Sequence, residues 1–415
     1  MKKVLSILLS VAMIVLCFAA CGKTDGDKSS IGKAANVKVG FIFLHDENST
    51  YDKNFITAAE EACKKAGVEI LKKTNISETQ ACYDAAAELV DEGCNVIFAD
   101  SFGHEPYIIQ AAKKFPEVQF LHATGTKAHT EGLSNYHNAF ASIYEGRYLA
   151  GVAAGMKLNE MISSGKITAD KAKMGYVGAY TYAEVISGYT SFYLGAKSVC
   201  PSVTMEVTFT GSWYDETAEK EAAQKLINNG CALISQHADS MGAPTACEAA
   251  GVPNVSYNGS TVSACPNTFI VSSRIDWAPY LEYAIDCVKN GKAIDTDWTG
   301  TLSTGSVVLT DVNTKAAAEG TQAKIDEVKA ELEGGKLHVF DTSTFTVTVS
   351  DSKNKNATVD ADGHLTGYKA DIDSDADNTG DTEVVSDGYF HESEKRSAPC
   401  FDVQIDGITL LDTKF

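Results

Sequence analysis

From Val37 onward, the sequence alternates short apolar runs with amphipathic stretches, and this alternation occurs in two similar series. The first series begins with the apolar run VKVGFIFL and the helix-patterned stretch YDKNFITAAEEACKKAG, and it ends at VQFLHATG. The second runs from EGRYLAGVAAGMKLNEMI to PNVSYNG, after a segment, GLSNYHNAFASIYE, that we expect to be a polar crossing. Because strands separated by helices form parallel sheets covered by helices, the pattern predicts an α/β protein with two similar lobes.

The N-terminus has the pattern of an export signal. Lys2 and Lys3 precede an apolar run of about 15 residues, which is shorter than the ~20 residues that a membrane-spanning helix requires. The run FAAC then resembles the lipobox of bacterial lipoproteins, in which the cysteine, here Cys21, is acylated and becomes the mature N-terminus. We therefore predict a signal peptide over residues 1–20 and a lipidated tether over residues 21–36, with the protein on the extracytoplasmic face of the cell membrane. Plain secretion is the alternative.

Charge and cysteine usage exclude some classes of function. The chain has 55 acidic and 35 basic residues, and its formal net charge of −20 disfavours nucleic acid as a partner. Nine of the 11 cysteines follow Cys21, and their spacing contains neither a CxxC pair nor a zinc pattern. Several lie within apolar helical patterns, so we expect buried thiols that pack as small hydrophobic groups.

The composition changes near residue 345. Residues 345–415 are rich in Asp, Thr, Ser and Gly and contain the β-patterned runs FTVTVS and FDVQIDGITLLD, which predict an acidic, β-rich C-terminal appendage. Its run DIDSDADNTGD suggests calcium binding. However, an EF-hand loop that begins at Asp373 would place Asn378 at the glycine position and Val384 at the bidentate glutamate position, so a solvated loop is the better interpretation.

Aromatic, amide and acidic residues recur where the predicted strands end. The clearest case is LISQHADSMG, in which His237 and Asp239 directly follow an apolar strand. In open α/β sheets, ligands bind beyond the carboxyl ends of the strands, and aromatic rings surrounded by acceptors suit a small polar ligand with a flat portion. The pattern therefore predicts a binding cleft. Asp215, before ETAEKEA, has a second interpretation as the N-cap of a helix.

Other kinds of chemistry compete with simple binding at His237. Hydrolysis would combine it with Asp239 and Ser240, but these residues are nearly adjacent, and the sequence has no G-x-S-x-G motif. We therefore predict no catalytic residue, no metal ligand and no cofactor, and we keep an exported nucleosidase-like hydrolase and a surface sensor or adhesin as alternatives. A composite metal site would have to combine histidines scattered singly near strand ends, namely His45, His104, His122 and His237.

Several motifs resemble those of the basic membrane protein (BMP, PnrA-like) family. The similarity extends from about residue 37 to residue 340 and is carried by YEGRYLAGVAAGMK, GYVGAY, GSWYD, LISQHADS and SRIDWAPY. The resemblance implies a lipoprotein that binds a nucleoside, with a purine nucleoside favoured, for a membrane permease of an ABC transporter, and that is not an enzyme. It also implies a type I periplasmic-binding-protein fold, in which two Rossmann-like lobes close like a Venus flytrap. The expected lobes comprise residues 37–140 with 268–295, and residues 141–267 with 296–344.

The resemblance also implies roles for individual residues. Tyr51 and Trp213 correspond to the aromatic residues that sandwich the base. Asn258, in SYNGS, stands where the family has an aspartate that binds the ribose, and Arg274 is the cation nearest to the position of a common lysine. Arg147, in YEGRYL, either braces its helix or contacts the ligand. Together with the strand-end residues, the expected ligand-binding set is Tyr51, Asn54, Phe102, Glu184, Trp213, His237, Asp239, Asn258, Arg274, Asp276 and Trp277.

Overall fold

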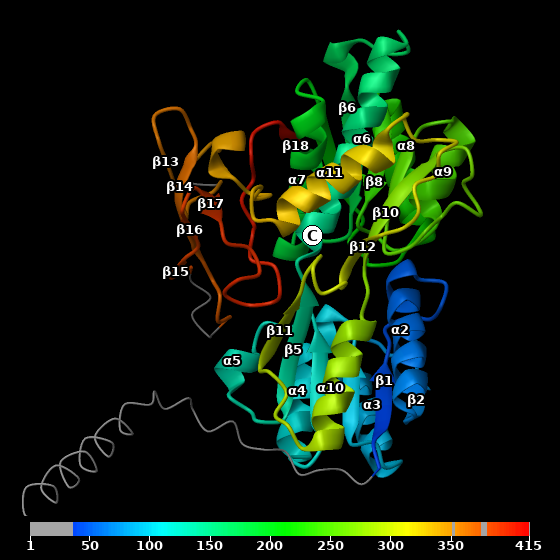
Figure 1. The fold of residues 1–415 in the computed structure, drawn as a ribbon, viewed down its shortest axis with the longest axis vertical. Coiled ribbons are helices and arrows are strands. Elements are labelled where there is room, and N and C mark those ends of the chain that lie inside the picture. Colours follow the sequence, from blue (N-terminus) through cyan, green and yellow to red (C-terminus); the bar gives the residue numbers. More distant parts are fainter. Residues whose placement is uncertain (1–35, 351–352, 375–379, 415) are drawn as a thin grey trace, which may run out of the picture.

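The computed structural model describes residues 36–350, 353–374 and 380–414. They form two lobes along the long axis of the molecule, with a smaller β-rich part beside them (Figure 1). The predicted signal peptide and Cys21 lie outside the described residues, as does most of the predicted tether. Among the helices of the described segments, none combines the length and the apolar composition that are needed to cross a bilayer.

The first lobe is a parallel sheet between two layers of helices. Helices α2 and α10 pack together on one face, and α3 and α4 cover the other. The spatial order of the strands is β11-β5-β4-β3-β1-β2. These strands are β1 (Lys38–Ile42), β2 (Glu69–Lys73), β3 (Val96–Ala99), β4 (Gln119–Ala123), β5 (Tyr136–Ala141) and β11 (Asp297–Gly300). The helices are α2 (Thr50–Ala66), α3 (Gln80–Asp91), η1 (Phe102–His104), α4 (Glu105–Lys114), α5 (Ala128–Glu131) and α10 (Ala278–Asn290).

The second lobe repeats this plan with a seven-stranded sheet in the order β12-β10-β9-β8-β6-β7-β18, parallel except for β12. Its strands are β6 (Lys173–Gly178), β7 (Thr204–Phe209), β8 (Leu233–Gln236), β9 (Asn254–Tyr257), β10 (Phe269–Ile275), β12 (Val307–Leu309) and β18 (Ile408–Leu410). Its helices are α6 (Ile143–Ser163), η2 (Ala169–Lys171), α7 (Ala183–Val199), α8 (Glu216–Asn228), α9 (Gly242–Ala250) and α11 (Thr321–Glu333).

Helices α6 and α7 lie unusually close together, which explains the small residues of the motif AGVAAG. A Cβ atom on Gly151 would lie 2.0 Å from the carbonyl oxygen of Phe192, and one on Gly195 would lie 2.0 Å from the carbonyl oxygen of Tyr148. Any larger residue would therefore separate the two helices. This part of the motif is structural.

The strand β5 lies in the segment that the sequence led us to expect as a polar crossing, and that expectation is wrong. The strand is buried along its whole length, and its polar side chains have partners. Asn138 accepts a hydrogen bond from the Ala128 amide (2.7 Å), and His137 lies 3.0 Å from the Gln119 side chain. Because buried polar groups are tolerated once they are hydrogen-bonded, a strand can be buried without an apolar sequence.

Two segments belong to the lobe opposite to the one expected. Strand β10, which we assigned to the first lobe, pairs with β9 in the second. Strand β11, which we assigned to the second lobe, pairs with β5 in the first. The chain therefore crosses between the lobes after β5, after β10 and after β11. Hydrogen bonds join these crossings, from the Ser142 amide to the Gly300 carbonyl (2.8 Å) and from the Asp276 amide to the Ser306 carbonyl (2.7 Å).

The C-terminal appendage packs against both lobes. Phe401 of the appendage stacks on Phe340, in the segment just before the appendage, with ring centroids 4.1 Å apart. Both rings form part of a core that is continuous with the second lobe, and β18 extends that lobe's sheet. The Ser397 amide donates to Asp297 in the first lobe (2.7 Å). The acidic run that raised the calcium question includes residues 375–379, which lie outside the described residues. The short helix η3 (Thr342–Thr344) lies just before the appendage. The strands of the appendage, apart from β18, are β13 (Ala357–Val359), β14 (Leu365–Ala370), β15 (Thr382–Glu383), β16 (Val385–Ser386) and β17 (Tyr389–Phe390).

The nine cysteines of the described residues are all buried free thiols. Burial raises the pKa of Cys63 and of Cys231 to about 12, so neither is a thiolate at neutral pH. The expectation of structural thiols is confirmed for these nine.

Candidate functional site

A cavity between the lobes comprises about 370 Å³ of space free of protein atoms, part of which is open to solvent. Residues that follow the carboxyl ends of strands in both sheets line it, as expected for this class of fold. The first lobe contributes Leu44, His45, Tyr51, Asp52, Ser101, Phe102 and Thr124. The second lobe contributes Glu184, Trp213, His237, Asp239, Tyr257 and Asn258.

Seven of the eleven expected ligand-binding residues line this cavity, and four do not. Trp277 is 1% exposed and stacks on Phe55 (centroids 4.3 Å apart) in the core of the first lobe. The other three form a cluster at the crossing after β10. There Arg274 donates to Asn54 (3.3 Å) and pairs with Asp276 (3.6 Å), so their polar groups hold the crossing in place. The structure also places Asp215 at the N-cap of α8, where it accepts from the Ala218 amide (2.9 Å).

Six lining residues were absent from the expected set. Thr124 directly follows β4, and Tyr257 is the last residue of β9, so the strand-end rule could have found both. Thr124 has a positive φ of 63°, which is uncommon for a β-branched residue. His45 and Asp52 gave a weaker signal, because a loop separates them from β1. The missing six are Leu44, His45, Asp52, Ser101, Thr124 and Tyr257.

Both ring nitrogens of His237 face other side chains of the second lobe. Its Nε2 lies 3.4 Å from a carboxylate oxygen of Glu184, and its Nδ1 lies 3.4 Å from the hydroxyl oxygen of Tyr176. The ring also packs on Tyr257, with centroids 4.8 Å apart. The Ser240 hydroxyl instead accepts from the Gly242 amide (3.0 Å). The three residues of the hydrolase hypothesis are therefore not assembled as nucleophile, base and orienting acid.

Arg147 supports the part of the cavity wall that His237 and Tyr257 form, from the side away from the cavity. Its guanidinium is fully buried and lies 4.8 Å from the ring centroid of Tyr257. It donates to the Tyr176 hydroxyl (2.9 Å), and also to the Gln236 carbonyl (3.2 Å) and the Ser235 hydroxyl (3.2 Å) on β8. Arg147 does not line the cavity, so it braces the wall and does not contact a ligand held in the cavity.

The loop that carries Asp239 is fixed by a buried acid. Asp239 accepts from the Asn258 side-chain amide (3.0 Å), and its own amide donates to the Trp213 carbonyl (3.0 Å). Glu219, which is fully buried, accepts from the Ser240 amide (3.1 Å). Burial raises the pKa of Glu219 to about 7. Burial also holds the pKa of Asp239 well above its usual range, with the charge of Glu219 adding to the effect, so a neutral Asp239 carboxyl that can both donate and accept is favoured.

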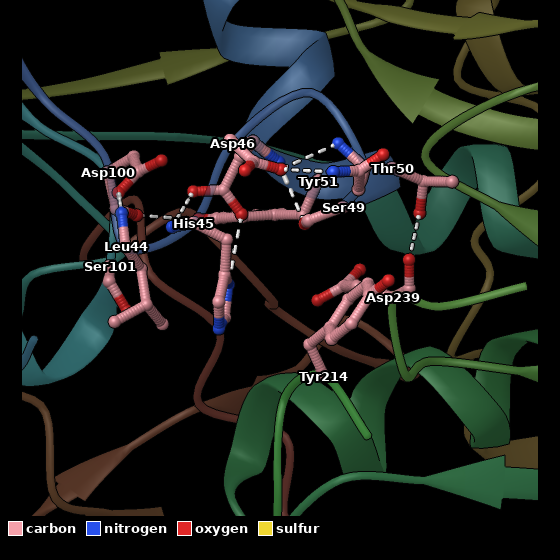
Figure 2. Close-up of polar contacts among 12 residues, drawn as sticks. Leu44, His45, Asp46, Ser49, Thr50, Tyr51, Asp100, Ser101, Tyr214 and Asp239 are labelled. Carbon is pink, nitrogen blue, oxygen red and sulfur yellow. Dashed lines mark hydrogen bonds and ion pairs between the residues drawn. The ribbon is translucent and has the colours of Figure 1, made fainter. Parts of the chain in front are cut away.

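A second acidic pair, Asp100 and Asp52, accepts hydrogen bonds from the loop that follows β1 in the first lobe, and Figure 2 shows the contact of Asp100 with Leu44 of this loop. Asp100 is fully buried and accepts from the Leu44 amide (3.1 Å), and burial beside Asp52 raises its pKa well above its usual range. Asp52 is also desolvated, but hydrogen bonds from His45 and Ser49 hold its pKa below the usual value. The Tyr51 hydroxyl donates to the Asp100 carbonyl (2.7 Å), which fixes the ring at the cavity wall.

The two lobes touch each other around the cavity. The Asp239 carbonyl of the second lobe accepts a hydrogen bond from Thr50 at the start of α2, as Figure 2 shows. The His45 ring of the first lobe packs on Tyr214 of the second, with ring centroids 5.5 Å apart. Within the described residues, no group of three or more His, Cys, Asp or Glu side chains could hold a metal ion. The arrangement offers aromatic faces, neutral and charged acceptors, and two histidines, all of which suit the binding of a small polar molecule.

Comparisons with known proteins agree on the family. Residues 40–336 match the model of the Bmp family, described as ABC transporter substrate-binding protein PnrA-like. The purine-binding protein of Brucella abortus is 31% identical over 310 residues, which cover 73% of this chain and 83% of that protein. The nucleoside-binding protein BmpA of Lactococcus lactis is 24% identical over 58% of this chain and 66% of its own.

Two further similarities concern the fold and a relative whose name gives another ligand. An ABC transporter solute-binding protein from Conexibacter woesei has the same fold, with a TM-score of 0.60 at 21% identity over 73% of this chain and 98% of its own. A putative glucose-binding protein of an ABC transporter from Haloferax volcanii is 26% identical over 78% of each chain.

Proposed function

The chain belongs to the family of PnrA-like ABC transporter substrate-binding proteins, and from this premise we propose that it captures a purine nucleoside between its lobes for import. One observation carries the proposal: aromatic rings and buried polar side chains from both lobes converge on a single cavity. A nucleoside combines a flat base with a hydroxylated sugar, which is the combination that such a lining recognises.

Individual roles follow from the positions of the side chains. Tyr51 and Trp213 come from opposite lobes, so we assign them to the two faces of the base. Asp239 and Asn258 are joined by a hydrogen bond, and the carboxyl and amide together offer donors and acceptors to a base edge or a ribose hydroxyl. The Glu184 carboxylate lies 3.4 Å from His237 Nε2, and we assign it to accept a hydrogen bond from a sugar hydroxyl.

We also propose that the protein is held on the outer face of the cell membrane by a lipid on Cys21 and delivers its ligand to a membrane permease. The motif FAAC supports this part of the proposal. A Cys21→Ser variant expressed in a bacterial host should leave the membrane fraction while keeping its ligand affinity. A variant that stays in the membrane fraction would refute the anchor and leave the binding proposal intact.

A thermal-shift screen of the chain from Lys23 onward tests the ligand class. The compounds are purine and pyrimidine nucleosides, nucleobases, free sugars including glucose, and amino acids. A ligand present at about 100 times its dissociation constant stabilises the folded state by ~2.7 kcal/mol, which gives a visible shift. We expect the largest shift with purine nucleosides. A response to glucose alone would refute the proposed cargo.

The same preparation separates a receptor from the nucleosidase-like alternative. Adenosine and guanosine are incubated for hours with excess protein and then separated by chromatography. A receptor returns the nucleosides intact, whereas a hydrolase releases the free base and ribose.

A further inference from the structure

A second chamber adjoins the interlobe cavity on the side of the C-terminal appendage. It comprises about 1310 Å³ of space free of protein atoms, part of which is open to solvent, and it shares Phe102, Thr124 and Glu184 with the interlobe cavity. Both lobes line it, and the appendage supplies the outer wall with residues that include Arg396, Asp402 and Gln404. The two spaces therefore adjoin at these three side chains.

Two exposed aromatic rings lie at the boundary between the interlobe cavity and the chamber. Phe102 from the first lobe is 38% exposed, and Tyr182 from the second is 41% exposed, although their ring centroids are only 5.3 Å apart. Tyr182 is backed by the stacked ring of Tyr180, with centroids 5.1 Å apart. Only Phe102 of these rings also lines the interlobe cavity. A pair of rings left open to a chamber offers apolar faces to a ligand.

The polar lining of the chamber favours an uncharged, hydroxyl-rich group. Thr124, Thr126 and Gln404 can exchange hydrogen bonds with hydroxyls, and Glu184 and Asp402 can accept from them. The Glu184 carboxylate repels a phosphate. Asp402 adds to this repulsion when it is ionised, although burial raises its pKa and it already accepts a hydrogen bond from the Tyr368 hydroxyl. Aromatic faces surrounded by hydroxyl partners suit a sugar ring.

The arginine of the chamber wall is already committed to backbone carbonyls. Arg396 donates through Nη1 to the carbonyl oxygens of Asp371 and Ile372 (3.0 Å each), through Nη2 to that of Pro399 (3.0 Å), and through Nε to that of Ala398 (3.2 Å). Recognition of a phosphate by arginine requires a free pair of N–H groups. Arg396 therefore holds the chamber wall together and is not arranged as a phosphate clamp.

We propose that this chamber is a second subsite, which binds an uncharged, hydroxyl-rich group, such as a glycosyl group, attached to the nucleoside in the interlobe cavity. The proposal rests on the proposed function, because the nucleoside anchors the attached group. It makes the appendage part of the binding site, and Tyr182 a residue that determines which nucleoside derivatives are accepted.

Calorimetric titration with four matched probes tests the proposal. The probes are adenine, adenosine, adenosine with a glucosyl group on the 2′, 3′ or 5′ oxygen, and adenosine 5′-monophosphate, and the guanine series is run in parallel. We expect at least one glucosylated nucleoside to bind as tightly as the nucleoside or more tightly. We expect the monophosphate to bind about tenfold more weakly than the nucleoside, because it would bring a charge beside Glu184 and Asp402.

Variants of Tyr182 test whether the glucosyl group binds in the chamber. Tyr182→Ala should weaken the glucosylated nucleoside roughly fivefold more than the unsubstituted nucleoside, through loss of the ring face. The unsubstituted nucleoside should lose some affinity as well, because the Tyr182 ring packs on Trp213 with centroids 6.0 Å apart. Tyr182→Phe keeps the ring and should bind like the wild type. Val349→Ala is the control, since Val349 is 41% exposed and does not line the chamber.

The outcomes separate this proposal from the proposed function. If nucleosides bind but every glucosylated form is rejected, or if the monophosphate binds as well as the glucosylated nucleoside, the second subsite is refuted and the nucleoside receptor stands. Equal losses for both ligands in Tyr182→Ala also refute the subsite. If none of the probes binds, the proposed function itself fails.

Discussion

The Thr50 amide in the first lobe donates a hydrogen bond to the carbonyl oxygen of Asp239 in the second lobe, with an N···O distance of 3.1 Å. The Thr50 hydroxyl donates to the same oxygen, also at 3.1 Å. Asp239 lines the cavity, so this contact ties closure of the lobes directly to the candidate site. Contacts of this kind between the lobes set how readily the lobes part.

Replacing Thr50 by proline should favour the open form. Thr50 is the first residue of α2, where proline is well tolerated, and Ser49 before it is already extended (φ −74°, ψ 129°). The variant therefore loses the interlobe donors without breaking the helix. One hydrogen bond contributes about 0.5–1.5 kcal/mol, so nucleoside affinity should fall roughly two- to thirteenfold. Small-angle scattering of the unliganded variant should give a larger radius of gyration than that of the wild type.

Thr50→Ala, which keeps the backbone amide, is the control for Thr50→Pro. Equal effects in both variants would contradict the role of the amide.

Trp213 should report ligand binding through its fluorescence. The chain has three tryptophans, and only Trp213 lines the cavity, whereas Trp277 and Trp298 belong to the first lobe. We expect purine nucleosides to change the emission of the wild type and of Trp298→Phe, but not that of Trp213→Phe. Trp213→Ala should also lose about 1–3 kcal/mol of binding free energy, the usual contribution of stacking between a base and an aromatic ring. A full fluorescence response in Trp213→Phe would remove this residue from the site.

Arg147 should control stability and binding together. Replacing it by methionine leaves the Gln236 carbonyl and the Tyr176 hydroxyl without their donor in a fully buried place, which should lower the free energy of unfolding by about 2 kcal/mol or more. Nucleoside affinity should fall as well, because Tyr257 and His237 lose the support behind them. Urea denaturation and calorimetry measure the two effects. Arg147→Lys keeps the charge but not the forked donor, so it should lie between the wild type and Arg147→Met. A stable Arg147→Met variant that binds normally would show that the guanidinium does not brace the wall.

Glu219 should make the protein less stable as the pH rises toward neutrality. Its folded-state pKa of about 7 lies above the ordinary value of 4.5, so between these values the folded chain binds a proton that the unfolded chain has lost. The stabilisation is therefore complete below about pH 4.5 and is lost as the pH rises through about 7. In Glu219→Gln the unfolding midpoint should fall less steeply between pH 5 and about 8 than in the wild type. Glu216→Gln, on the exposed side of α8, should keep the wild-type slope. Parallel slopes in all three proteins would contradict the assignment.

The sequence could predict the plan of the fold and much of the cavity lining, because both depend on where strands end. His237, Asp239 and Asn258 directly follow apolar runs, and the carboxyl ends of parallel strands meet at the ligand-binding edge. Trp277 has the same pattern in sequence but lies in the core of the first lobe. It follows a strand after which the chain crosses between the lobes, and the sequence does not show to which side the ring turns.

The remaining differences arise from long-range pairing. Strands β10 and β11 joined lobes other than those expected, because the choice depends on which sheet edge each strand meets and not on its own residues. Strand β5 was missed because its polar side chains find partners more than ten residues away, such as Gln119 and Asp295. The chamber beside the appendage has no local signal at all, since Phe102, Tyr182 and Asp402 come from three separate parts of the chain.

Calorimetric titration of purine nucleosides into the chain from Lys23 onward, in parallel with Trp213→Ala, tests the central claim most directly. We predict saturable binding of one nucleoside per chain to the wild type, and a loss of about 1–3 kcal/mol in the variant. Absence of binding heat with every purine nucleoside, or equal affinity in the two proteins, would contradict the account of the interlobe cavity as a nucleoside site.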